Sequence, residues 1–248
     1  VALALFRKAD RLSFELTGDE MFSLPLIASV AQIRPGHVLR VLDAASAEIT
    51  NVKQELGITE TVASPVREPS RVPSDVLGQC FSVNRVLNLL LEQPFSPSDV
   101  FQQLHVARDL LKGLVLGLGG DPESIPVPAY ERRRRPTDVF GSLLGTFETL
   151  RTAAVSSGLE MLKIKSGLTA SDEIVPGDVF DVASLVLAEV AYLHGHLGNP
   201  AVSEIFASHH LGRKLPSHCF QIAQHLGLLA KQFAGLAEKQ SDWAKSKK

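Results

Sequence analysis

The spacing of the histidines is the feature of this chain that most resembles a metal-binding site. Six of the eight histidines fall between positions 194 and 225. His194 and His196 form an H-x-H pair, and His209 and His210 are adjacent. Imidazoles at such spacings can gather a metal ion. The structural alternative is favoured, because the first pair ends a predicted helix, where imidazoles interact with the last carbonyl groups, and the second lies in a predicted loop.

Four consecutive arginines form the second candidate. Arg132, Arg133, Arg134 and Arg135 follow Tyr130 in the segment "SIPVPAYERRRR", which also contains two prolines. Guanidinium groups bind carboxylates and phosphates, and arginine and tyrosine are both enriched at protein interfaces. We therefore predict that these five residues bind a partner. The alternative is that the apolar part packs on the chain's own helices while the arginines face water.

The two cysteines offer little chemistry. Cys80 and Cys219 lack the spacing of a metal site. Each falls on a predicted apolar helix face, where cysteine usually acts as a small buried hydrophobe, and a disulfide between them is the alternative. The sequence contains no G-x-S-x-G, H-E-x-x-H, C-x-x-C or P-loop motif. We predict a protein that is not an enzyme and needs no cofactor.

Composition limits the classes of partner. Apolar residues make up 45% of the 248 residues and charged residues 21%, which is typical of a globular chain. The formal net charge of −2 gives no general attraction to nucleic acid or to anionic lipid. Apolar runs such as "SLVLAEVAYL" reach about half the roughly 20 residues of a membrane-spanning helix. We expect neither nucleic acid binding nor a membrane span.

A short motif predicts where the helices begin. Its six copies read "RPGHVL", "VPSDVL", "SPSDVF", "RPTDVF", "VPGDVF" and "LPSHCF". Proline is favoured at the first helical position, because the amide that it lacks would have no partner there. Two places later, Asp75, Asp99, Asp138 and Asp178 meet the positive end of the helix dipole. We predict that these four aspartates are structural helix caps near free amides of their own first turns.

Each motif is followed by an apolar stripe. Counted from the residue after the Asp or His, apolar residues recur at positions 0, +4, +7, +11 and +14, with Thr146 as the polar exception. This spacing, which we call the seam, averages 3.5 residues and excludes β-strands, whose period is two. The sequence predicts an all-α fold, a bundle or short solenoid of about seven amphipathic helices. Residues 1–16 match less well and form the seventh helix.

The motif prolines stand at positions 35, 73, 97, 136, 176 and 216, so four of the five intervals are 38 to 40 residues. We interpret this as an internal repeat of about 40 residues. It differs from the 34-residue tetratricopeptide repeat and from the HEAT repeat, which holds two helices in a similar length. We predict a single helical-repeat domain over residues 1–248, with a division into 1–120 and 121–248 as the alternative.

The lengths of the linkers limit the directions in which neighbouring helices can run. Most contain about 15 to 18 residues, and an extended linker of 16 spans up to about 50 Å, whereas a 20-residue helix is about 30 Å long. Such linkers can return along a helix, so neighbouring helices can be parallel. We expect them to lie extended on the surface, stiffened by proline. The short connection before residue 97 instead predicts an antiparallel pair formed by residues 76–92 and 97–116.

These observations favour a non-catalytic helical-repeat protein that acts as an interaction module or structural assembly subunit, with other proteins as partners. A ligand-binding or sensor domain with a pocket between helices is the first alternative, favoured by small seam residues such as Ala107 and Ala183. A metal-binding protein that uses the His-rich region is the second. A start at Val1, Pro-rich linkers and few cysteines suit an exported, periplasmic bacterial protein, and equally a trimmed cytosolic one.

Overall fold

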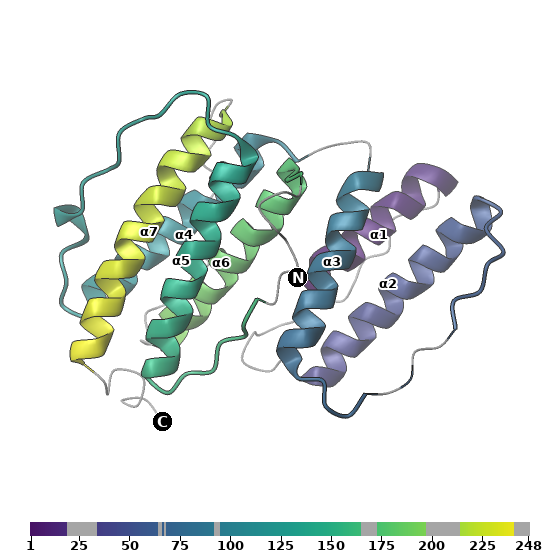
Figure 1. Ribbon diagram of the computed structural model, residues 1–248, viewed down its shortest axis with the longest axis horizontal. Coiled ribbons are helices and arrows are strands. Elements are labelled where there is room, and N and C mark those ends of the chain that lie inside the picture. The colour runs from purple at the N-terminus through teal and green to yellow at the C-terminus, as the bar shows by residue number, and fades with distance from the viewer. Residues whose placement is uncertain are drawn as a thin grey trace. The chain divides into compact units, whose positions relative to one another are not determined.

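The computed structural model describes residues 1–18, 34–63, 66, 68–91, 95–164, 173–196 and 214–240. These residues form seven α-helices and no β-strand, so the predicted all-α class is confirmed (Figure 1). None of the described helices is both long and apolar enough to cross a membrane. The α-helices are α1 (Ala2–Thr17), α2 (Pro35–Glu55), α3 (Pro73–Leu90), α4 (Pro97–Gly117), α5 (Pro136–Ser156), α6 (Pro176–His196) and α7 (Pro216–Lys239), and a short 3₁₀ helix, η2, spans Pro122–Ser124.

Helices α2 to α7 each begin at a motif proline. At each start the third helical residue exchanges two hydrogen bonds with the residue just before the helix. The Arg135 amide donates to Oδ2 of Asp138 at 2.8 Å, and the Asp138 amide donates to the Arg135 carbonyl at 3.0 Å. The same two bonds join Asp75 to Val72, Asp99 to Ser96, Asp178 to Val175, His37 to Arg34 and His218 to Leu215.

This pattern is the carboxylate half of a capping box, in which a side chain at the third position satisfies the amide before the helix. The side chain therefore accepts from the amide immediately preceding the helix, whereas the prediction placed it near amides within the first turn. In His37 and His218 the acceptor is Nδ1, at 3.1 Å in both cases. An imidazole thus takes the position that a carboxylate holds in the other four copies.

The described helices pack into two compact units, which we describe separately. The first unit contains α1, α2 and α3, and the second contains α4, α5, α6 and α7. The boundary between these two units falls between α3 and α4, and the alternative division at residue 120 stays a prediction. The predicted antiparallel pair has one helix in each unit and stays a prediction, as does the grouping of the chain as a single domain.

The second unit is a ring of four helices in which α4 and α5 each pack against both α6 and α7. The start of α4 lies beside the start of α7, since the Cys219 thiol donates to the Pro97 carbonyl at 3.1 Å. Their ends also meet, because the Gln240 side-chain amide donates to the Leu118 carbonyl at 2.9 Å. Helices α4 and α7 are therefore parallel.

The other two helices of this ring run in the same direction. The Arg134 amide, just before α5, donates to the Ser217 hydroxyl in the first turn of α7 at 3.2 Å. Thr146 lies against Gly227 in the middle of both helices. Late in α4, Gly113 lies against His194, which is late in α6. All four helices thus have their starts at one end of the unit.

The seam residues of this unit form its core. Leu104, Val186 and Leu226 are fully buried, as predicted. The polar seam residue Thr146 is also buried, and its hydroxyl donates to the Ser142 carbonyl at 3.0 Å. That bond within the helix lets a polar side chain sit in an apolar core.

In the first unit α1 packs against both α2 and α3. Its core consists of Leu5, Phe6, Ala9, Leu12, Ala45, Val52, Cys80, Leu87 and Leu91. The prediction that Val76 is buried is wrong, because 45% of this residue is exposed. The reason is tertiary: within its unit α3 packs mainly on α1, whereas each helix of the second unit packs on two neighbours.

Candidate functional site

Residues 122–135, which we call the strap, connect α4 to α5 and hold the predicted partner-binding residues (Figure 1). Glutamines of α7 fix the strap along its length. Gln232 donates to the Asp121 carbonyl at 3.0 Å, just before the strap, and Gln221 donates to the Pro128 carbonyl at 2.7 Å. The strap therefore runs along α7 against the direction of that helix, returning the chain to the end of the unit where α5 begins.

The four arginines do not share one environment. Arg134 forms an ion pair with Glu131, and its guanidinium lies 4.3 Å from the ring centroid of Phe220. Arg132, Arg133 and Arg135 are exposed. Arg134 is thus held against α7, whereas the side chains of the other three arginines are exposed to solvent.

The apolar part of the strap is also partly exposed. Val127 is 65% exposed and Tyr130 is 42% exposed. The Tyr130 ring packs at an angle against the ring of His218, with centroids 4.9 Å apart. One face of the tyrosine is therefore fixed by α7 while the other remains accessible.

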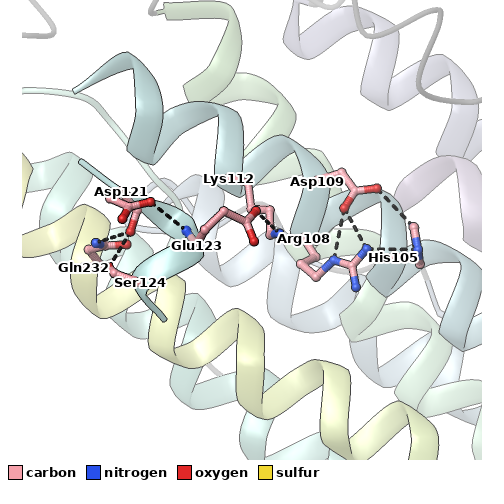
Figure 2. A network of polar contacts seen from close by, with 8 residues as sticks. All are labelled: His105, Arg108, Asp109, Lys112, Asp121, Glu123, Ser124 and Gln232. Atoms are coloured by element: carbon pink, nitrogen blue, oxygen red, sulfur yellow. Dashed lines mark hydrogen bonds and ion pairs between the residues drawn. The ribbon is translucent and has the colours of Figure 1, made fainter. Parts of the chain in front are cut away.

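A polar network that the sequence reasoning missed lies on α4, beside the beginning of the strap (Figure 2). His105 Nδ1 and Asp109 Oδ2 are 3.1 Å apart, and Arg108 contacts the same carboxylate with Nε at 3.0 Å and an Nη at 2.8 Å. Arg108 Nη2 also lies 2.9 Å from His105 Nε2. Because arginine can only donate, His105 Nε2 accepts the hydrogen bond from Arg108. His105 Nδ1 therefore carries the ring proton and donates a hydrogen bond to Asp109.

This triangle has little catalytic capacity. The imidazole nitrogen that a general base would use is already occupied by Arg108. The three residues lie at helical spacing with their side chains partly exposed, and a partly exposed ion pair such as Arg108–Asp109 contributes about 0.2–1 kcal/mol to stability. The i, i+4 pair of His105 and Asp109 was the sequence signal that could have identified this network.

A second ion pair in the network joins the strap to α4. Lys112 Nζ lies 2.6 Å from Glu123 Oε1. The hydrogen bond and charge of Lys112 lower the pKa of Glu123. Asp121 starts the 3₁₀ turn by accepting the Glu123 amide at 3.0 Å, and the Ser124 hydroxyl donates to the Asp121 carbonyl at 2.6 Å. The strap thus begins from a fixed turn.

His225 is buried on α7, near the positive side chains of α4. Burial lowers its pKa, and the charges of Arg108 and Lys112 lower it further, against the opposing effects of the Glu123 charge and of a hydrogen bond with the Ile125 backbone. Among the described residues, its Nε2 atom has no hydrogen-bond partner. These surroundings favour a neutral imidazole that packs between helices.

Metal binding was the less favoured interpretation of the histidines, and two of the candidate ligands, His194 and His196, lie in different environments. His194 is buried, burial lowers its pKa, and its ring packs so closely on Gly113 that a Cβ there would lie 3.0 Å from Nε2. His196 meets the edge of Tyr192, with ring centroids 4.6 Å apart. His209 and His210 lie outside the described residues. Within the described part of the chain no three potential metal ligands come together, and the metal-binding alternative stays a prediction.

Both cysteines are free thiols in buried positions, Cys80 in the first unit and Cys219 in the second. Burial raises the pKa of Cys219 to about 12, and burial also raises that of Cys80. A thiol with a raised pKa is a poor nucleophile at neutral pH. The environment of both cysteines therefore fits the small buried hydrophobe inferred from the sequence.

No protein-family model matches this chain, and no curated protein or solved structure is similar enough to it to count as a match. The geometry of the strap and of its contacts with α4 and α7 therefore supplies the observations for a functional proposal.

Proposed function

We propose that the chain is a non-catalytic helical-repeat protein that acts as a protein interaction or assembly subunit, and that the strap binds its partner. The observation that carries this proposal is the fixed conformation of the strap. Its backbone is anchored to α7 at Pro128 and at Arg134, and its first turn is tied to α4 through Glu123.

A fixed strap lowers the entropic cost of binding. A segment that is already ordered loses less conformational entropy when a partner covers it. The prolines of "SIPVPAY" restrict the backbone further. Val127 and Tyr130 supply exposed apolar surface next to the anchors, and the tyrosine can pack with few rotamers to restrict.

The charge of the strap indicates the kind of partner. Arg132, Arg133 and Arg135 are exposed. Glu131, the acidic residue next to them, forms an ion pair with Arg134. The outward face therefore carries excess positive charge beside an apolar patch. A protein surface with acidic residues around an apolar centre complements it.

The same proposal treats the 40-residue spacing as a structural repeat. Each motif sets a helix start, and a long linker returns the chain to the same end of the bundle before the next start. In this arrangement the helices serve as scaffold, while linkers such as the strap are free to vary and carry specificity.

We expect a photoreactive amino acid placed at Val127 to crosslink to the partner. The full-length chain carrying this substitution would be irradiated in cells of the source organism and the products identified by mass spectrometry. The same substitution at Val155, which is 50% exposed on α5 and outside the strap, is the matched control. Products that form equally from both positions, or from Val155 alone, would count against the strap as the binding surface.

A further inference from the structure

A buried histidine of α7 faces the beginning of the strap. His225 is 3% exposed, and its ring hydrogen-bonds with the backbone of Ile125, the residue that follows η2. Its Nε2 atom is buried and, among the described residues, has no hydrogen-bond partner. Helix α7 therefore presents a titratable ring to the strap at a place that solvent does not reach.

The charged groups around this ring come from α4 and from the strap. Arg108 and Lys112 of α4 act on it with positive charge, and Glu123 of the strap acts on it with negative charge. Glu123 is also held by Lys112, with 2.6 Å between Oε1 and Nζ. Within the described residues, α5, the other helical neighbour of α7, adds no charge that acts on the ring. A proton on His225 would therefore bring a third positive charge to a cluster that holds one negative charge.

The closed strap thus fits a neutral imidazole and does not fit an imidazolium. A buried cation is costly unless water or an acceptor surrounds it, and the described packing gives Nε2 no acceptor. Burial and the two charges of α4 both lower the pKa of His225, as expected from this mismatch. If the ring takes up a proton, some part of the structure that covers it must move to let water in.

The beginning of the strap is the part that can move at the lowest cost. It is held by the ion pair between Lys112 and Glu123, whose side chain is 77% exposed, and by the hydrogen bond from Gln232 to the Asp121 carbonyl. Helix α7, in contrast, is held by fully buried seam residues such as Leu226. Segments held by few, solvent-exposed contacts open locally without unfolding the rest of a domain.

We propose that protonation of His225 releases residues 122–126 of the strap from α4 and α7, so that the strap is closed at neutral pH and opens in mildly acidic solution. A ring that has been released into water has the ordinary histidine pKa of about 6.5, and the closed ring has a lower one. The closed state is therefore fully stable above about pH 6.5 and loses stability as the pH falls below it. This switch concerns the conformation of the strap and does not depend on whether the strap binds a partner.

Hydrogen exchange of the strap amides in the full chain tests the proposal. The amides of Glu123, Ser124 and Ile125 donate to Asp121 or Pro122, so they are protected while this turn is held in place. From about pH 7.5 to about pH 5.5 their protection, corrected for intrinsic exchange rates, should fall up to about tenfold, because opening binds one proton. At both pH values they should be less protected than the amide of Leu226, since they open without unfolding of the unit.

Two substitutions remove the titrating ring, His225→Leu and His225→Gln, and circular dichroism at neutral pH shows which of them fold. In each folded variant the protection of the strap amides should change less than about twofold between the two pH values. Glu123 does not titrate in this range, because Lys112 lowers its pKa. His218→Asp is the matched control. It removes the imidazole beside Tyr130 but keeps the carboxylate that four other motif copies carry, so it should respond to pH as the wild type does.

A wild-type response that persists in the His225 variants, or that disappears in His218→Asp, would overturn the proposal. Equal protection of the strap amides and of Leu226 would also overturn it, because exchange would then require unfolding of the whole unit. The wild type alone supplies a test that needs no substitution. A loss of protection that begins only below about pH 5 would come from carboxylates and not from a histidine, and would contradict the proposal as well.

Discussion

Replacing Leu104 with Ala is expected to lower the free energy of unfolding by about 2–5 kcal/mol. Leu104 is fully buried between the parallel helices of the second unit. Removing its isopropyl group loses the transfer free energy of the buried atoms and leaves a cavity that rigid neighbours fill only in part. Urea denaturation of the full chain followed by circular dichroism would measure the loss in the transition of this unit.

Leu116 provides the matched control on the same helix. It is 60% exposed, so Leu116→Ala should change the free energy of unfolding by no more than about 0.5 kcal/mol. Equal effects of the two substitutions would contradict the assignment of the seam as the core. A cost for Leu116→Ala alone would mean that α4 is rotated relative to the described packing.

The second large effect is expected at the helix starts. Parallel helices place their dipoles side by side, with the positive ends together, which costs electrostatic energy. The carboxylates of Asp99, Asp138 and Asp178 lie at that end of the second unit and oppose this cost. Replacing one cap residue with Ala costs about 0.5–2 kcal/mol, and effects at separate helices add, so the triple variant should lose about 1.5–6 kcal/mol.

The triple Asp→Asn variant separates the hydrogen bond from the charge. An asparagine oxygen can still accept the amide before the helix, so this variant should keep the larger part of the stability that the Ala variant loses. Loss of partner binding in either variant without a loss of stability would show that these carboxylates form a binding site and are not caps.

The helix starts were predictable because their determinants are local. A proline at the first position and an acceptor at the third specify where a helix begins within a few residues of chain. The two His copies fit the same rule, since Nδ1 of His37 and His218 accepts the bond that a carboxylate accepts elsewhere. The stripe of 3.5-residue spacing likewise determined the helical class.

The remaining features depend on contacts between distant segments. The seam of α3 has the same pattern as the others, and nothing in its residues reveals that Val76 lacks a neighbour in its unit. The role of Arg134 was also hidden, because its partner Phe220 is far away in the sequence. The sequence offers no way to distinguish the four adjacent arginines. In the fold, Arg134 is the one that contacts Glu131 and Phe220.

Co-purification of full-length variants is the sharpest test of our proposal that the exposed strap arginines bind the partner. Arg132→Ser combined with Arg133→Ser spares Arg134 and its structural contacts. Lys231→Ser combined with Lys239→Ser, at exposed positions of α7 outside the strap, is the matched control. We predict that the arginine variant recovers about tenfold less partner with an unchanged melting temperature, and that the control recovers as much as the wild type. Wild-type recovery by the arginine variant would contradict the claim.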